Sequence, residues 1–172
     1  NLTSVDCSNN QLQSLNLAGL VNLNILTCNN NQLLSLDISE CISIASVDCS
    51  DNQLLSIFMK NGKLEGSGQF GNNAVDITNN PILLYICADE GEISGMQSLV
   101  DQLGYINCQI NSYCSFSPGG VFYEIQGISK LDSNANGCDV LDPAYPNLKF
   151  NVNSNTVSGT ILADNSGNYK LP

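Results

Sequence analysis

One segment decides the fold, because it occurs three times: VDCSNNQL at residues 5–12, LTCNNNQL at 26–33 and VDCSDNQL at 47–54. The central cysteines stand at positions 7, 28 and 49, so the segment repeats every 21 residues. A unit this short cannot bury its apolar side chains alone, whereas stacked units share one continuous core. The repeat therefore predicts a solenoid.

Further apolar residues flank the repeated segment at fixed positions. The full pattern, L-x-x-L-x-C-x-x-N-x-L followed by x-x-L-x-L, resembles the leucine-rich-repeat consensus, whose period range includes 21 residues. Apolar and polar residues alternate at the start of each segment, as expected for a strand with one face inward. We therefore predict a β-rich leucine-rich-repeat solenoid with a C-terminal cap over residues 1–116.

Cysteine and asparagine recur inside the predicted coils. The cysteines occupy inward positions, where a free cysteine behaves as a small hydrophobic residue. The asparagines stand where the chain leaves each strand, so their amides can bond the backbone of adjacent coils as an asparagine ladder. These residues are Cys7, Cys28 and Cys49, and Asn10, Asn31 and Asn52. We expect Cys41 to pack in the turn before Ile44.

The regular period fails after Met59. Residues 60–74 are rich in glycine and predict a loop or a widened coil. Residues 75–87 predict a last, degenerate coil, in which Cys87 takes the position that Cys7 has in the first coil. The open end of a solenoid exposes its core, so a cap is expected after this coil.

A capping helix is predicted over residues 92–103, because the apolar residues there have helical spacing. Ser94 is a candidate N-cap, and Gly104 is placed to end the helix. The chain has eight cysteines but no histidine and no C-x-x-C pair, which disfavours a zinc site. We hypothesise a local disulfide between Cys108 and Cys114; the alternative is that both thiols are free.

The residues after position 116 differ from the repeats in their pattern of apolar and turn-forming residues. Residues 117–120, SPGG, predict a linker. Alternating runs separated by turn residues predict strands at 121–127, 147–152, 156–162 and 169–171. We expect residues 121–172 to form a partial Ig-like β-sandwich module.

A segment between the first two of these strands has the spacing of a calcium loop. Oxygen-bearing side chains at positions one, three and five, followed by glycine, resemble the D-x-[DN]-x-[DN]-G motif. The candidate Ca²⁺ ligands are Asp132, Asn134, Asn136, the carbonyl of Cys138, Asp139 and Asp142. Position twelve is Pro143 rather than glutamate, so Asp139 or Asp142 would have to close the site. The alternative is a turn whose side chains bond its own backbone.

These segments together resemble a family of secreted Bacteroidetes proteins, flavobacterial ones in particular. Members carry L-x-C-S-x-N-Q-L repeats, N-N-P-x-L near the end of the array and D-N-S-G-N-Y further on. The matching segments here are NNPIL at 79–83, YCSFSPGG at 113–120, DSNANGCD at 132–139 and DNSGNY at 164–169. The resemblance implies a leucine-rich-repeat surface protein with a following Ig-like or B-repeat-like β-domain. It also implies type IX secretion to the cell surface or the medium.

Charge and hydropathy argue against several classes of partner. The net charge is −11 with five basic residues, so the chain lacks the Lys and Arg that nucleic acid or an anionic membrane surface requires. No apolar run is long enough to span a bilayer. The sequence starts in the middle of a repeat, which we interpret as a segment of a longer protein, extracellular or associated with the outer membrane.

We expect a non-catalytic binding or adhesion module that recognises protein or glycan through the outward residues of the predicted strands. These residues are Ser4, Asp6, Ser8, Ile25, Thr27, Asn29, Ser46, Asp48, Ser50, Leu84 and Ile86. A face that is merely solvated is the alternative. A second hypothesis is a spacer or structural subunit of an outer-membrane surface assembly. A polysaccharide-acting enzyme is least favoured, because its candidate carboxylates, Asp89, Glu90 and Glu92, lie in one short loop.

Overall fold

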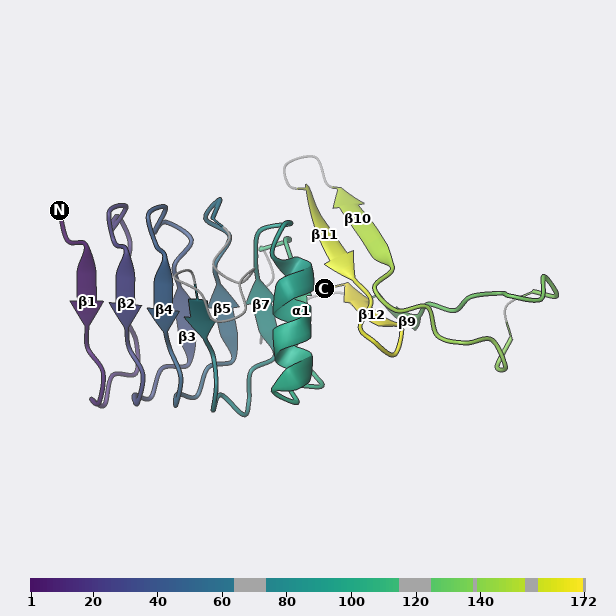
Figure 1. Ribbon diagram of the computed structural model, residues 1–172, viewed down its shortest axis with the longest axis horizontal. Helices are drawn as coiled ribbons and strands as arrows, with labels where there is room; N and C mark the ends of the chain where they lie inside the picture. Colours follow the sequence, from purple (N-terminus) through teal and green to yellow (C-terminus); the bar gives the residue numbers. More distant parts are fainter. Residues whose placement is uncertain (64–73, 115–124, 138, 154–157, 172) are drawn as a thin grey trace.

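The computed structural model of the chain is a β-solenoid of about five turns, followed by a second β-rich part (Figure 1). The solenoid strands lie side by side along its axis, from β1 near the N-terminus to the end where helix α1 stands. The structure describes residues 1–63, 74–114, 125–137, 139–153 and 158–171.

The coils contribute short strands to two parallel sheets, and the first coil contributes to sheet A alone. Sheet A consists of β1 (Ser4–Asp6), β2 (Ile25–Thr27), β4 (Ser46–Asp48) and β6 (Ala74–Asp76), in that order. The parallel strands of sheet B are β3 (Ser35–Asp37), β5 (Ser56–Phe58), β7 (Tyr85–Cys87) and β8 (Gln109–Asn111). The repeated segment forms the strand of sheet A, as expected. The second strand was not predicted, although x-x-L-x-L alternates in the same way.

The core fills the space between the two sheets. Strand register places equivalent apolar residues in line, with Leu26 beside Val47 in sheet A and Leu36 beside Ile57 in sheet B. Each of these side chains is at most 1% exposed. Stacking therefore buries what a single coil leaves open, and the predicted solenoid is confirmed.

The repeat cysteines are core residues, as predicted. Cys28 and Cys49 are buried free thiols, and Cys7 in the first coil is free and half-buried. Cys41 is also free and buried, and it lies in the turn in which the Ile44 N–H donates to the Cys41 carbonyl. These four thiols therefore act as small apolar groups.

The predicted asparagine ladder is present and is longer than expected. Asn52 accepts the Leu33 N–H at 2.9 Å and donates to the carbonyls of Cys28, Cys49 and Ser50. Asn31 and Asn80 make the equivalent bonds in the neighbouring coils. Each buried amide thus satisfies backbone groups of two coils at once.

The glycine-rich segment belongs to a widened coil. Sheet A pairs Asp48 with Asp76, so this coil is 28 residues long instead of 21. Residues 64–73 of this coil lie outside the described part of the chain. Ile77 takes the position that Cys49 has in the preceding coil, whereas Cys87 lies in β7 of sheet B. The expectation that Cys87 is equivalent to Cys7 is therefore wrong.

Helix α1 (Ile93–Gln102) lies at the end of the solenoid and confirms the predicted cap (Figure 1). It buries Ile93, Met96, Gln97 and Val100. The N-cap residue is Glu92, not Ser94, which lies inside the helix. Gly104 has φ 74° and ends the helix as expected, because that conformation suits glycine.

Four strands lie in the described residues of the second part. They are β9 (Ile125–Ile128), β10 (Lys149–Asn153), β11 (Ser158–Leu162) and β12 (Asn168–Leu171). Strands β10 and β11 form an antiparallel pair, and β11 also pairs with β8, so sheet B continues beyond the solenoid. Strands β9 and β12 form a separate antiparallel pair. Strands β9 to β12 overlap the four predicted strands and confirm them in their described residues. Residues 121–124 and 156–157 of these predictions and the predicted linker 117–120 lie outside the described residues.

Candidate binding surface

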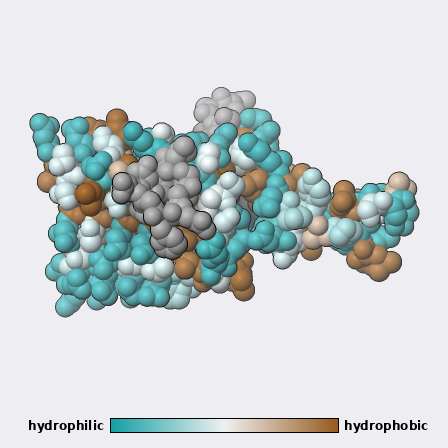
Figure 2. All heavy atoms as spheres, viewed as in Figure 1, coloured by the Kyte–Doolittle hydropathy of each residue, from teal (hydrophilic) through white to brown (hydrophobic). Residues whose placement is uncertain are grey.

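The outer face of sheet A carries outward side chains in rows that cross the coils. Register aligns Asp6 with Thr27, Asp48 and Asp76 in one such row. The sheet A face, as we define it, consists of Ser4, Asp6, Ser8, Ile25, Thr27, Asn29, Ser46, Asp48, Ser50, Asp76 and Thr78. In Figure 2 most of the solenoid surface on the visible side is hydrophilic. Nine of the eleven residues expected to point outward lie in strands of sheet A or shortly after them.

Two of the expected face residues lie elsewhere. Ile86 is fully buried and points inward from β7 of sheet B, and Leu84 is exposed but precedes the same strand. Because the widened coil shifts the register, Asp76 and Thr78 take their place on sheet A. The signal for them was present in the sequence, since VDIT at 75–78 aligns with VDCS at 47–50.

Hydrogen bonds fix the carboxylates of this face. Oδ1 of Asp48 accepts both the backbone N–H of Ser50, at 3.1 Å, and its hydroxyl, at 2.6 Å. Asp6 bonds Ser8 in the same way, and Asp76 makes the equivalent bonds to Thr78. The side chains therefore keep one orientation along the sheet.

The same bonds affect ionisation at the exposed end of the face. The Ser8 backbone N–H, and then the Ser8 hydroxyl, lower the pKa of Asp6 below its ordinary value because they favour the charged carboxylate. Not every member of the face is accessible, since Ser50 is buried. Ile25 is the apolar exception in these rows, and its side chain is 45% exposed.

A second polar row borders this face. Asn9, Asn30, Asp51 and Asn79 have φ between 52° and 57°, a left-handed conformation that asparagine and aspartate tolerate. Asn30 donates to Oδ1 of Asn9 at 3.2 Å, and Asn79 donates to Oδ1 of Asp51 at 2.8 Å. All four are exposed, so the polar surface extends around the edge of the coils. The recurrence of Asn or Asp directly before each ladder asparagine was the available signal.

The candidate calcium loop is a tight turn whose oxygens bond its own backbone. Asp132 accepts the N–H groups of Asn136 and Gly137, and Oδ1 of Asn134 also accepts the Asn136 N–H. Gly137 has φ 95°, which permits the sharp bend expected there. The local bonds are those that a self-satisfied turn requires.

The remaining candidate calcium ligands are engaged in a similar way. Asp142 is buried and accepts the Asp139 N–H at 2.8 Å, while Asp139 accepts the Leu141 N–H at 2.7 Å. Cys138 lies outside the described residues. Within the described part of the chain, no group of three or more His, Cys, Asp or Glu side chains is placed to hold a metal ion. A bound Ca²⁺ would have to share these oxygens with the backbone N–H groups that they already accept.

The acidic loop before the helix has structural contacts. Oδ2 of Asp89 accepts the backbone N–H groups of Asn61 and Gly62, at 3.0 and 2.7 Å. Glu92 is fully buried and accepts the Asp89 N–H, whereas Glu90 is exposed. Asp89 thus attaches the start of the inserted segment to the loop that precedes α1.

The cysteine pairing differs from the hypothesis. The disulfide joins Cys87 to Cys114, with 5.3 Å between their Cα atoms, and Cys108 is a buried free thiol. Cys108 directly precedes β8 and packs into the core, which keeps it away from Cys114. Residues 112–114 instead turn back over the outer face of sheet B, where Cys87 lies in β7.

Among the residues that the structure describes, no helix combines the length and the hydrophobicity needed to cross a bilayer. Compared with known proteins, the chain matches no family model, no curated protein and no solved structure.

Proposed function

We propose that the chain is a non-catalytic binding or adhesion module, secreted or at the cell surface, that recognises protein or glycan through its sheet A face. The observation that supports this most is the row of Asp48 and Asp76 with their bonded hydroxyl partners. Groups whose orientation is fixed before binding lose less conformational entropy when a ligand binds. The resemblance to secreted repeat proteins supports the proposed location.

The chemistry of the face favours a ligand with repeated polar groups. Adjacent strands are about 4.8 Å apart, so Asp48 and Asp76 offer carboxylates at that interval across the coils. Such a row suits the hydroxyl groups of an extended glycan or the basic side chains of a protein. The net charge of −11 favours a neutral or cationic partner in both cases.

A matched pair of variants tests this proposal. Asp48→Ala combined with Asp76→Ala removes the carboxylate row, whereas Asp37→Ala removes the same Asp–Ser arrangement from sheet B, where Asp37 bonds Ser39. On glycan and surface-protein arrays, we expect the double variant to lose the wild-type signals and Asp37→Ala to keep them. Loss of the signals in neither variant, or equally in both, would contradict a role for sheet A.

Exposed apolar residues favour a second candidate function, that of a spacer or subunit of an outer-membrane surface assembly. Val140 and Leu141 in the second part are 89% and 86% exposed, and Ile125 and Ile128 are more than half exposed. Figure 2 shows apolar surface along this part of the molecule. Single exposed apolar residues are common, but several on one small part favour a protein contact.

Isolation from the native cell surface separates the two candidates. A binding module is expected to purify alone after mild detergent treatment, whereas a subunit is expected to retain outer-membrane proteins in a fixed ratio. The variant Val140→Ser with Leu141→Ser should abolish that retention if the second part makes the contact.

A further inference from the structure

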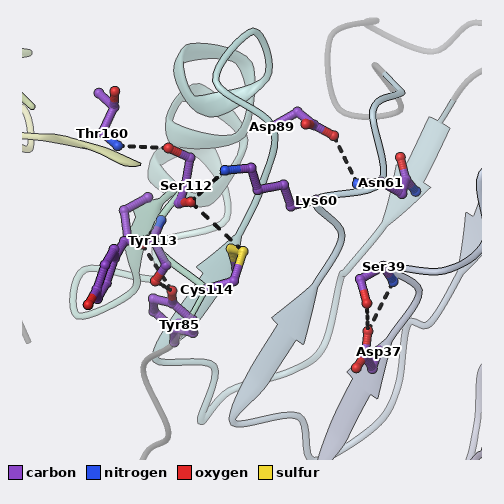
Figure 3. The surroundings of a disulfide bond; sticks show 12 residues. Asp37, Ser39, Lys60, Asn61, Tyr85, Asp89, Ser112, Tyr113, Cys114 and Thr160 are labelled. Carbon is purple, nitrogen blue, oxygen red and sulfur yellow. Dashed lines mark hydrogen bonds between the residues drawn. A yellow bond between two sulfur atoms is a disulfide. The ribbon is translucent and has the colours of Figure 1, made fainter. Parts of the chain in front are cut away.

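A short segment after the last solenoid strand closes over the outer face of sheet B. We call it the clasp, and it consists of residues 111–114 together with Tyr85, Cys87 and Lys60, which hold it. Figure 3 shows Lys60, Tyr85, Ser112, Tyr113 and Cys114 in the surroundings of the disulfide. The clasp residues Asn111 and Ser112 are each 1% exposed.

The clasp is attached to the solenoid by a disulfide and by polar contacts. Cys114 is bonded to Cys87 of β7. The Tyr85 hydroxyl bonds the Tyr113 carbonyl at 2.7 Å and Oδ1 of Asn111 at 3.0 Å. Nζ of Lys60 donates to the Ser112 carbonyl at 2.9 Å, which the figure also shows (Figure 3). The disulfide is the only covalent link among these contacts.

The same residues attach the second part of the molecule. The Ser112 N–H donates to the Thr160 carbonyl at 2.9 Å, and the Thr160 N–H donates to Oγ of Ser112 at 2.7 Å. Strand β11 meets β8 where Ile161 pairs with Asn111. A Cβ on Gly159 would come within 2.9 Å of the Tyr113 nitrogen, so the two backbones are in close contact there. The attachment of β11 therefore depends on where the clasp lies.

The described residues of the two parts also make contacts outside the clasp. Leu162 packs against the solenoid core, and Asn165 donates a hydrogen bond to Asp101 of α1. The regular coils do not depend on these contacts, because their own ladder and core hold them. Release of the clasp is thus expected to detach β10 and β11 without unfolding the coils.

The free thiols of the core are unsuited to exchange with the disulfide. Burial raises the pKa of Cys108 to about 12 and is the main cause that raises the pKa of Cys28 to about 12; it also raises the pKa of Cys49. Thiol–disulfide exchange requires a thiolate, so these groups do not attack the bond. Cys87 is fully buried, whereas Cys114 is only half-buried and is the sulfur that an external thiolate can reach.

We propose that the Cys87–Cys114 disulfide is a redox-controlled clasp that fixes the β10–β11 pair on the end of the solenoid. An external dithiol reverses it: its thiolate attacks Sγ of Cys114, Cys87 leaves as a thiolate and takes a proton, and the second thiol then releases Cys114. The dithiol becomes a cyclic disulfide, and both cysteines become thiols. The reduced chain keeps its coils but frees β10 and β11, which uncovers Tyr85 on sheet B.

Hydrogen–deuterium exchange of the full chain, before and after treatment with dithiothreitol, tests this proposal. We expect exchange at 109–114 and 158–163 to become at least about tenfold faster on reduction, while exchange at 26–58 is unchanged. The variant Cys87→Ser with Cys114→Ser should behave as the reduced chain does and should not respond to dithiothreitol. Restoring the bond in the wild-type chain with an oxidant should restore the slow exchange.

Two results would overturn the proposal. If 158–163 keeps its protection after reduction, the hydrogen bonds of Tyr85, Lys60 and Ser112 hold the second part without the disulfide. If 26–58 loses protection together with it, the bond supports the whole fold and is not a clasp. Should the serine variant fail to fold, reduction of the wild-type chain still decides between these outcomes.

Discussion

The regular coils and the second part of this molecule bury their apolar residues to very different extents. In the coils, Leu26 and Leu36 are fully buried, because each has an equivalent residue in the adjacent coil. In the second part, Val140 and Leu141 are almost fully exposed. A repeated coil therefore packs its apolar residues against the equivalent residues of the adjacent coils. A part without such copies depends on the end of the solenoid or on another molecule.

Substitution of a ladder asparagine is the most severe test of this dependence on adjacent coils. Asn52→Ala removes the acceptor for the Leu33 N–H and the donor to the carbonyls of Cys28, Cys49 and Ser50, all in or near the core. Each buried group left without a partner costs about 1–3 kcal/mol, so the free energy of unfolding should fall by at least about 3 kcal/mol. Urea denaturation followed by circular dichroism measures this change.

Asn10, the first asparagine of the predicted ladder, provides the matched control for that variant. Asn10 is exposed, and its side-chain amide donates to carbonyls of its own coil, those of Cys7 and Ser8. Asn10→Ala should therefore cost less than about 1 kcal/mol. Equal losses for the two variants would mean that coil-to-coil bonding through Asn52 is not what stabilises the array.

A substitution at the end of the ladder should have a smaller effect on the free energy of unfolding. The Tyr105 hydroxyl accepts the Asn80 N–H and donates to the Ile77 carbonyl, both at 3.0 Å, where a further coil would otherwise bond. Tyr105→Phe should lower the free energy of unfolding by about 1–3 kcal/mol, because both groups lose their partner. Tyr145→Phe at a 43% exposed position should change it by less than about 0.5 kcal/mol. Thermal unfolding of the two variants side by side distinguishes a specific bond from a general cost of losing a hydroxyl.

The calcium hypothesis concerns the second part alone. If the loop binds Ca²⁺, calorimetric titration of the full chain should show binding that Asp132→Ala removes, since Asp132 supplies the first ligand position. Asn9→Ala, outside the loop, should leave the titration unchanged. An absence of binding to the wild-type chain would mean that the turn is satisfied by its own hydrogen bonds to Asn136 and Gly137.

The smallest effect is a change in pH dependence at Asp6. Its pKa is lower in the folded chain than its ordinary value, so the ionised form favours the fold above that ordinary value. This contribution disappears as the pH falls through the lowered pKa of the folded state. Ser8→Ala removes one of the two bonds and should raise the pKa of Asp6 in a ¹³C NMR titration, whereas Ser39→Ala should not. An unchanged value would show that the backbone N–H alone sets the shift.

The sequence predicted the features that depend on local repetition. The 21-residue period identified the coils, the buried cysteines and the ladder positions, because equivalent residues of successive repeats occupy the same structural environment. Helix α1 was predicted because Met96 and Val100 follow a helical period and Gly104 can adopt positive φ. Each of these features is determined by residues nearby in sequence or by the equivalent residues of the adjacent coil.

The features that depend on non-repeated contacts were missed. The seven-residue widening of one coil placed Asp76 on sheet A and moved Ile86 into sheet B, and no local pattern gives the size of such an insertion. The pairing of Cys87 with Cys114 depends on how the chain turns after β8. Spacing alone had made Cys108 the nearer partner of Cys114, although Cys108 packs into the core.

We propose that the sheet A face, and not the second part, makes the functional contact. The most direct test is the Kd of the best array ligand for the wild-type chain, for Asp48→Ala with Asp76→Ala, and for Val140→Ser with Leu141→Ser. We expect the sheet A variant to bind at least about tenfold more weakly and the second-part variant to bind as the wild type does. Weaker binding by the second-part variant alone would contradict the claim and place the contact on the exposed apolar residues.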